Sequence, residues 1–280
     1  MRFLEGAGVR LLVDATVGGG GHARAFLESF PEARVVGTDR DSGILETARR
    51  ALAPFADRAT LHHAAFSELE ATLGGADEAA PDAFLFDLGV NSMQLDEAAR
   101  GFSFREDGPL DMRMDRTRGR TAAELLRHIP EADLGNLLFD LGGERSARRV
   151  AAALVAERRR ARIETTLQLA SIVRRAVRGR SRIDAATRTF QALRMAVNDE
   201  GNELGAGLAT AARRVRPGGR ILVLSFHSGE DRIVKNFFRS EPSLAPLTKR
   251  PLPCTPEEAR RNPRARSAKL RVAERRREDA

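Results

Sequence analysis

The chain has 280 residues, of which 42% are hydrophobic, so it can bury one large core or two modest ones, which excludes wholesale disorder. No apolar run approaches the roughly 18 residues that a membrane-spanning helix needs, and no signal-peptide pattern opens the chain, so we expect a cytoplasmic protein without a membrane partner. The single cysteine, Cys254, excludes an internal disulfide and fits a reducing compartment.

The formal net charge is +8, and the basic residues are concentrated in two segments. Residues 145–182 contain twelve arginines against two glutamates, and residues 260–280 contain nine basic residues against three acidic ones. A general preference for arginine over lysine, 44 against 3, explains the choice of cation but not its clustering. The clustering indicates a polyanionic partner such as a nucleic acid.

In the first ninety residues, apolar runs of strand length alternate with helical patterns. The expected strands are 9–16, 33–39, 59–66 and 82–89, and the expected helices are 22–30, 42–52 and 67–73. Asp41 or Ser42 caps the second of these helices, and Ser67 with Glu70 has the spacing of a capping box at the third. Such alternation predicts βαβ units and a parallel sheet.

Between about residues 103 and 185 the strand patterns stop and four amphipathic helices are expected. The first follows the capping box of Thr121 and Glu124 and ends at Pro130, the second runs from Pro130 to Gly142, the third has an apolar face from Ala147 to Val155, and the fourth runs from Thr165 or Thr166 to Gly179. We therefore expect a helical insertion at 104–185 within an α/β domain formed by 1–103 and 186–280, with the arginines on its solvated face.

The α/β pattern resumes after the insertion. Helices are expected at 186–200 and 207–215, followed by a turn at Arg216–Gly219 and a buried strand at 219–227. From Pro242 onward, the tail is expected to be irregular, with a late strand at 269–275.

Four glycines, Gly18 to Gly21, follow the first expected strand and open a helix. Glycines at the carboxyl end of a parallel strand let a ligand approach the backbone closely, and the helix start adds free N–H groups. Asp39 ends the second strand, where an acid accepts hydrogen bonds from ribose hydroxyls of NAD and of S-adenosyl-L-methionine alike. The spacing Gly18, Gly20, Ala23 also fits a dinucleotide motif, so the loop alone leaves NAD, a methyl donor or a plain turn open.

Three further features favour the methyl donor. Asp14 precedes the loop, where methyltransferases commonly place an acid facing the methionine ammonium. Asp87-Leu88-Gly89 ends the fourth strand, where amino-methyltransferases contact the target amine. Arg216-Pro217-Gly218-Gly219 precedes a late strand, as it frequently does in methyltransferases.

The segment between residues 85 and 116, LFDLGVNSMQLDEAARGFSFREDGPLDMRMD, closely resembles bacterial methyltransferases that modify N4 of a cytidine in the decoding region of 16S ribosomal RNA. Further motifs of that family match in order along nearly the whole chain, at Thr16–His22, 186–200, 225–235 and 262–275. The resemblance implies a Rossmann-like class I methyltransferase sheet with an inserted all-helical domain that recognises RNA, and a substrate within the small ribosomal subunit. It leaves open whether the protein is a monomer or a homodimer.

The resemblance also implies S-adenosyl-L-methionine as cofactor, with contacts from the glycine loop, the strand ends and the segments that follow them. With Asp14 included, the expected cofactor residues are Asp14, Gly18, Gly20, Gly21, His22, Asp39, Phe66, Asp87 and Gln94. Phe66 would pack on the adenine or else belong to the core. The expected RNA contacts of the insertion are Arg158, Arg159, Arg160, Arg174, Arg175 and Arg178.

The sequence departs from the family pattern in two places that bear on the site. The family begins with an extra segment carrying a His-x-Pro-Val-Leu motif, whereas Met1 lies only eight residues before the first expected strand, so either the start differs or the pocket closes differently. The usual DLGVSSPQLD is DLGVNSMQLD here, with Asn91 and Met93.

The expected chemistry is transfer of an activated methyl group to a poorly nucleophilic amine, which needs alignment and an acceptor for the amine protons. Asp87, or the Leu88 carbonyl with Asn91 and Ser92, is expected to accept from the amine. His227 contacts the base, accepts a proton or simply closes its strand. Without Tyr or Trp, Phe102 and Phe104 are candidates for base stacking, or else core residues.

Other reaction classes are less well supported by the sequence. Methylation at C5 of cytosine needs a cysteine nucleophile, and Cys254 lies near the tail, outside the α/β motifs. The five histidines show no metal-ligand spacing, so no catalytic metal is expected. An NAD-dependent oxidoreductase and a non-catalytic RNA-binding assembly factor with a degenerate pocket remain the alternatives.

Overall fold

A computed structural model describes residues 3–4, 8–74, 79–177 and 184–277. The chain forms two compact units: a sheet unit, Met1–Gly89 with Gly201–Ala280, and a helical unit, Val90–Glu200. The helical unit includes more residues on both sides than the insertion expected at 104–185. The reason is that Val90 and Leu95 on one side, and Phe190 and Leu193 on the other, pack into the same hydrophobic core as the helices between them.

The sheet unit is built on one twisted sheet whose order, within the described residues, is β3-β2-β1-β4-β5-β8-β6, with β7 paired to β8. The strands are β1 (Leu11–Asp14), β2 (Arg34–Asp39), β3 (Ala59–His63), β4 (Ala83–Asp87), β5 (Arg220–Ser225), β6 (Leu244–Pro246), β7 (Leu252–Pro253) and β8 (Lys269–Arg275). The first five pair in parallel, whereas β6 and β7 each pair antiparallel with β8, which itself pairs antiparallel with β5. The expected parallel sheet is thus correct for β1 to β5 and incomplete for the tail.

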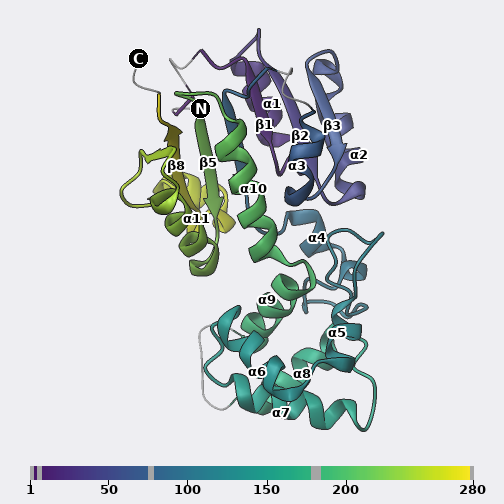
Figure 1. Ribbon diagram of the computed structural model, residues 1–280. Coiled ribbons are helices and arrows are strands. Elements are labelled where there is room, and N and C mark those ends of the chain that lie inside the picture. The colour runs from purple at the N-terminus through teal and green to yellow at the C-terminus, as the bar shows by residue number, and fades with distance from the viewer. Residues whose placement is uncertain (1–2, 5–7, 75–78, 178–183, 278–280) are drawn as a thin grey trace. The chain divides into compact units, whose positions relative to one another are not determined.

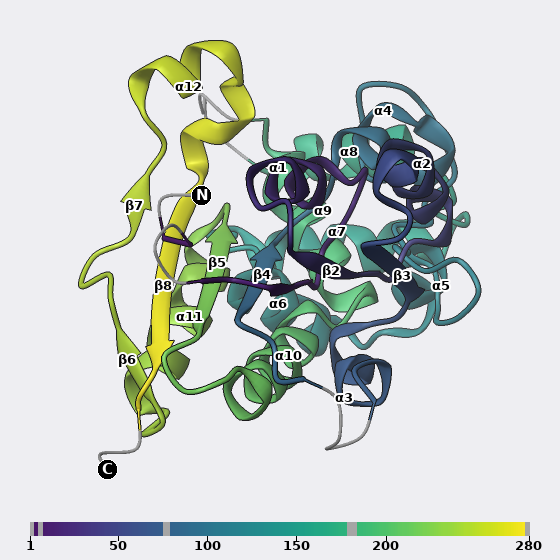
Figure 2. The ribbon, with the colours of Figure 1, turned by 90° about the horizontal axis from the view of Figure 1, so that it is seen from above.

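Helices cover both faces of this sheet, giving three layers (Figure 2). The helical segments of the sheet unit are α1 (Gly21–Ser29), α2 (Ser42–Leu52), η1 (Ala53–Phe55), η2 (Phe66–Glu68), α3 (Leu69–Thr72), α10 (Glu200–Arg214), α11 (Ser228–Ser240), α12 (Pro256–Arg261) and η4 (Pro263–Ser267). Strand residues alternate between the faces: Leu12 packs with α1 and α2, whereas Val13 packs with α10 and α11. This alternation buries both faces of the central strands and leaves the strand ends to carry the loops.

The structure corrects two local expectations in the sheet unit. The capping box expected between Ser67 and Glu70 does not form; instead the Glu68 carboxylate accepts the Ala65 N–H at 2.6 Å, and the segment opens as a 3-10 turn. The helix expected at 207–215 begins earlier, at Glu200, because Asp199 adopts a left-handed φ of 47° and separates it from the preceding helix. The Asp41 cap forms as expected, with its side chain accepting the Gly43 N–H at 3.1 Å.

The helical unit packs its helices around one core (Figure 1). Its helical segments are α4 (Ser92–Asp96), η3 (Ala98–Arg100), α5 (Ala122–His128), α6 (Glu131–Asp140), α7 (Ala147–Arg158), α8 (Thr166–Ala176) and α9 (Ala186–Val197). The Thr121–Glu124 capping box forms, and Thr165 caps α8. Gly179, the expected end of α8, lies outside the described residues. Among the described residues, every helix is either too short or too polar to cross a bilayer.

Candidate active site

Three aspartates end three neighbouring strands of the sheet unit. Asp14, Asp39 and Asp87 are the last residues of β1, β2 and β4. Because β1 lies between β2 and β4 in a parallel arrangement, the three carboxylates lie at one edge of the sheet, where the strand order reverses. This is the position at which sheets of this type bind ligands.

The glycine loop folds over the same edge. The Val17 N–H donates to the Thr38 carbonyl at 2.9 Å, and Gly20 adopts a left-handed φ of 85° at the N-cap of α1. A Cβ on Gly20 would lie 3.3 Å from Leu52 Cγ, whereas a Cβ on Gly21 would meet no atom within 4 Å. Gly20 is therefore required by the fold, while Gly21 leaves an open approach to the backbone.

Asp14 is a fully buried carboxyl with an unused oxygen. Its Oδ1 accepts the Thr16 N–H at 3.2 Å, but its buried Oδ2 has no hydrogen-bond partner in the described part of the chain. Burial raises the pKa of Asp14 to about 7, against the lowering influence of His22. A buried acid of this kind is stabilised by a ligand that brings a positive charge.

Both carboxylate oxygens of Asp39 accept hydrogen bonds from nearby backbone N–H groups. Its Oδ2 accepts the Gly18 N–H at 3.0 Å, and its Oδ1 accepts the Asp41 N–H at 2.9 Å. Burial nevertheless raises the pKa of Asp39 to about 6. In the structure Asp39 holds the glycine loop, while its role in binding ribose hydroxyls stays a prediction. Each of its oxygens has a second lone pair that can accept a further hydrogen bond.

Asp87 faces His22 across the same edge. The Asp87 Oδ2 lies 3.6 Å from His22 Nδ1, and the Asp87 N–H donates to the Thr16 hydroxyl at 2.6 Å. The buried Oδ1 has no hydrogen-bond partner among the described residues. Burial raises the pKa of Asp87; His22 opposes this effect and the charge of Glu230 adds to it. Like Asp14, it offers an unused acceptor.

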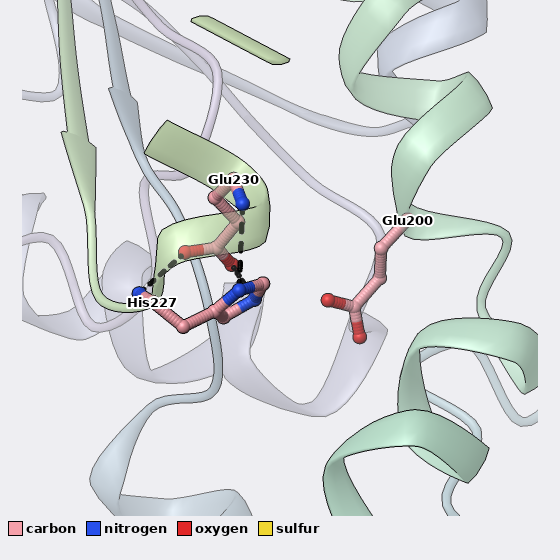
Figure 3. A group of neighbouring side chains, drawn as sticks. All are labelled: Glu200, His227 and Glu230. Carbon is pink, nitrogen blue, oxygen red and sulfur yellow. Dashed lines mark hydrogen bonds and ion pairs between the residues drawn. The ribbon is translucent and has the colours of Figure 1, made fainter. Parts of the chain in front are cut away.

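His227 follows β5 and caps α11 (Figure 3). Its Nδ1 accepts the N–H groups of Gly229 at 3.2 Å and of Glu230 at 3.4 Å. A neutral ring therefore carries its proton on Nε2, which lies 3.1 Å from Glu230 Oε1 without the alignment of a hydrogen bond. The Glu230 carboxylate in turn accepts the Phe226 N–H at 2.9 Å. This arrangement favours helix capping over proton transfer as the role of His227.

Three expected site residues belong to the helical unit, at the start of α4. Asn91 is the N-cap: its side chain accepts the Gln94 N–H at 2.9 Å, and the Gln94 Oε1 accepts the Asn91 N–H at 3.2 Å. Gln94 is buried and Ser92 is exposed at the first helical position. Asn91 and Gln94 therefore define the start of α4.

The aromatic candidates are divided between packing and partial exposure. Phe66 is half-buried and contacts Phe86 edge to face, with ring centroids 5.3 Å apart. Phe102 is buried in the core of the helical unit, which supports the core alternative and excludes the stacking one for this residue, because its ring is covered by protein. Phe104 packs against Phe190 at 4.8 Å and carries the Arg174 guanidinium over its ring at 5.5 Å.

The arginines expected to contact RNA differ in their surroundings. Arg159 and Arg160 are exposed, and neither forms an ion pair within the described residues. Arg158 is half-buried, and its guanidinium donates to the carbonyls of Leu126 and Ile129 at the end of α5, which is a structural role. Arg174 pairs with Asp184 at 2.8 Å and Arg175 with Glu157 at 3.5 Å, and Arg178 lies outside the described residues.

Two residues that shape this edge were missed by sequence reasoning. The Thr16 hydroxyl fixes the main chain of Asp87, although the loop motif drew attention to the glycines. Glu230 is buried beside His227, and its charge raises the pKa of Asp87. The three-residue spacing from His227 to Glu230, which is that of a capping box, was the signal available in the sequence. Both residues act on Asp87 from segments that follow other strands, so their roles could be recognised only once the order of the strands in the sheet was known.

Comparisons with known proteins identify the family. The model of the MraW methylase family matches residues 1–276. A ribosomal RNA small subunit methyltransferase H from Sorangium cellulosum (strain So ce56) is 50% identical, covering 94% of this chain and 84% of the relative, and one from Nitrobacter hamburgensis is 49% identical with the same coverage. The solved structure of an rRNA methylase from Streptococcus thermophilus is 10% identical, with a TM-score of 0.45 over 96% of this chain and 88% of that one. From the family match and the two relatives, the chain belongs to the MraW methylase family.

Proposed function

We propose that this protein is an S-adenosyl-L-methionine-dependent methyltransferase that methylates N4 of a cytidine in 16S ribosomal RNA. Membership of a methylase family and the names of its relatives support the reaction class and the ribosomal RNA of the small subunit. The resemblance of the DLGVNSMQLD segment supports the cytidine amine as target. The substrate would be the RNA within the small ribosomal subunit, in the cytoplasm.

The observation that carries the cofactor assignment is the charge of the site. Asp14 and Asp87 each present a buried carboxylate oxygen without a partner in the described residues, beside the glycine loop. A dinucleotide would bring its negatively charged pyrophosphate to this position, and two buried acids would repel it. S-adenosyl-L-methionine brings a sulfonium and an ammonium, which neutralise such acids. The site therefore fits a cationic ligand and disfavours NAD.

The roles of the remaining cofactor residues follow if the methionine part of the cofactor lies beside Asp14. Asp14 would accept from the methionine ammonium, Gly18, Gly20 and Gly21 would let the backbone approach the ligand, and His22 would flank it. Asp39 would accept from the ribose hydroxyls through its free lone pairs, as an acid after β2 can. Phe66 would contact the adenine with its exposed face, and Gln94 remains part of the proposed set on sequence grounds alone.

When bound, the cofactor supplies a methyl group that is already activated by the positive sulfur. The protein aligns the cytidine amine with that group, and Asp87 Oδ1 accepts a hydrogen bond from the amine, which weakens conjugation of its lone pair with the ring. The Leu88 carbonyl, with Asn91 and Ser92, provides further acceptors on the same segment. Asp87 is therefore the residue proposed to touch the reacting atoms.

The helical unit would bind the RNA backbone through its exposed arginines. Arg159 and Arg160 are proposed as direct phosphate contacts, and Arg174 and Arg175 as contacts that exchange a carboxylate partner for a phosphate. Binding through phosphates releases counterions, so affinity should fall steeply with salt. Arg178 remains part of the proposal on sequence grounds alone.

A thermal-shift comparison tests the cofactor assignment. S-adenosylhomocysteine and S-adenosyl-L-methionine should each raise the melting temperature of the full chain, while NAD at the same concentration should not, because binding to the folded state stabilises it. Stabilisation by NAD alone would overturn the proposal. Ligand binding without any methyl transfer to RNA would instead indicate a non-catalytic RNA-binding factor.

A further inference from the structure

The segment that carries Phe66 is fastened to helix α10 by a glutamate. The Glu203 Oε2 accepts the Ser67 N–H at 3.0 Å, and its Oε1 accepts the Ser67 hydroxyl at 2.9 Å. One carboxylate thus takes both donors of the residue directly after Phe66. The charge of the acceptor strengthens both bonds.

One turn further along α10, the helix backbone lies directly against the Phe66 side chain. A Cβ on Gly207 would lie 2.8 Å from Phe66 Cβ and 3.1 Å from Phe86 Cε1. The Phe66 ring meets Phe86 at an interplanar angle of 80°. Glu203 holds the main chain beside Phe66, while Gly207 and Phe86 limit where its ring can turn.

The other end of the same segment has a separate attachment to α10. The Glu70 carboxylate pairs with Arg213 at 3.0 Å and with Arg214 at 3.1 Å. Arg214 also donates to the carbonyls of Leu73 and Gly74. This second attachment holds the end of the segment that lies away from Phe66, and therefore provides a matched control.

We propose that Glu203 is a positioning residue for the cofactor: through Ser67 it sets the orientation in which Phe66 presents its exposed face to the adenine. The inference rests on the proposed function, because it takes Phe66 as the adenine contact. Glu203 touches neither the ligand nor the reacting atoms. Its removal loosens the 3-10 turn of η2 and leaves Phe66 with more than one orientation.

A double-mutant cycle between Glu203 and Phe66 tests this link. Glu203→Ala should weaken binding of S-adenosylhomocysteine by about three- to tenfold in isothermal titration calorimetry, which lies in the lower part of the range found for coupled neighbours. The same change should raise the KM for the methyl donor and leave kcat at saturating donor nearly unchanged. In a Phe66→Ala background, Glu203→Ala should have no further effect on affinity. Glu70→Ala should lower the melting temperature without changing affinity.

The outcomes separate the inference from the proposed function. An equal loss of affinity from Glu203→Ala in both backgrounds, or an equal loss from Glu70→Ala, would overturn the positioning role of Glu203. Unchanged affinity in Phe66→Ala alone would refute the contact of Phe66 with the ligand. Failure of the unmodified chain to bind S-adenosylhomocysteine would refute the proposed function itself.

Discussion

The Asp39 Oδ2 accepts the Gly18 N–H at 3.0 Å, so the acid that ends β2 holds the glycine loop that follows β1. Its neighbour Asp14 has the opposite character, because its Oδ2 is buried without a partner among the described residues. The two aspartates lie at the same sheet edge, and burial raises the pKa of both. Asp39 therefore uses its oxygens to hold the loop, while Asp14 has one buried oxygen without a partner among the described residues.

We expect Asp14→Asn to stabilise the free protein above neutral pH and to weaken ligand binding. The pKa of about 7 exceeds the usual 3.8, so the folded state holds a proton that the unfolded state has lost, and stability falls as pH rises from about 4 to about 7. An amide removes this penalty, which is on the order of 4 kcal/mol at pH 8 and vanishes near pH 4. Urea unfolding across this pH range measures the difference.

Asp39→Asn is the matched control for that prediction. The amide removes a buried charge, but it also turns an N–H toward the N–H of Gly18 or Asp41, and the two effects oppose each other within about 1 kcal/mol.

Affinity for S-adenosylhomocysteine should rise with pH through the pKa of Asp14, and this rise should be absent in Asp14→Asn. If the Asp14→Asn variant and the parent chain were equally stable at pH 8, the destabilising effect assigned to the buried Asp14 carboxylate would be contradicted.

Alanine substitutions at Gly20 and Gly21 should separate folding from binding. Gly20→Ala places a Cβ at positive φ, 3.3 Å from Leu52 Cγ, so it should cost about 1–2 kcal/mol of stability. Gly21→Ala begins α1 and meets no atom within 4 Å, so stability should hold or rise. Its methyl group would nevertheless block the ligand, and calorimetry should show a loss of affinity. Unchanged affinity in Gly21→Ala would show that the ligand does not approach this backbone.

Reversing the charges of Arg159 and Arg160 to Glu should weaken RNA binding and reduce its salt dependence, because two phosphate contacts are lost. Filter binding at several salt concentrations measures both effects. The same reversal at Arg10 and Arg34, exposed at the amino ends of β1 and β2, changes the net charge equally and should weaken binding less. Arg158→Ala should instead lower stability by about 1–3 kcal/mol, through the lost bonds to Leu126 and Ile129. If the reversal at Arg159 and Arg160 and the reversal at Arg10 and Arg34 gave the same RNA affinity, the proposed binding of RNA by the helical unit would be contradicted.

His227→Asn should keep both stability and kcat, because asparagine also caps helices well. The imidazole Nδ1 accepts two N–H groups at the start of α11, and an asparagine oxygen can accept them. His227→Ala should lose about 1 kcal/mol. A normally folded His227→Asn variant with a large loss of kcat would show that the imidazole takes part in the reaction.

Much of the sheet edge was predictable because local sequence determines it. Asp14, Asp39 and Asp87 each follow an apolar run, and in a parallel sheet such positions share one edge. The limits were equally physical. The antiparallel strand β8 pairs with β5 across 44 or more residues, and hydrogen bonds such as Ser67 to Glu203 span 136, which no local pattern encodes. For Phe102 the sequence left base stacking and core packing open, because exposure cannot be read from residue type; its burial in the helical unit supports the core.

The most direct test is nucleoside mass spectrometry of 16S ribosomal RNA incubated with the protein and S-adenosyl-L-methionine carrying a labelled methyl group. Naked RNA and small ribosomal subunits should be compared, with Asp87→Ala as the inactive control that still folds. We expect labelled N4-methylcytidine with the parent chain and none with Asp87→Ala. Label at C5 of cytosine, label on no nucleoside, or full turnover by Asp87→Ala would contradict the proposed reaction or the role of Asp87 in it.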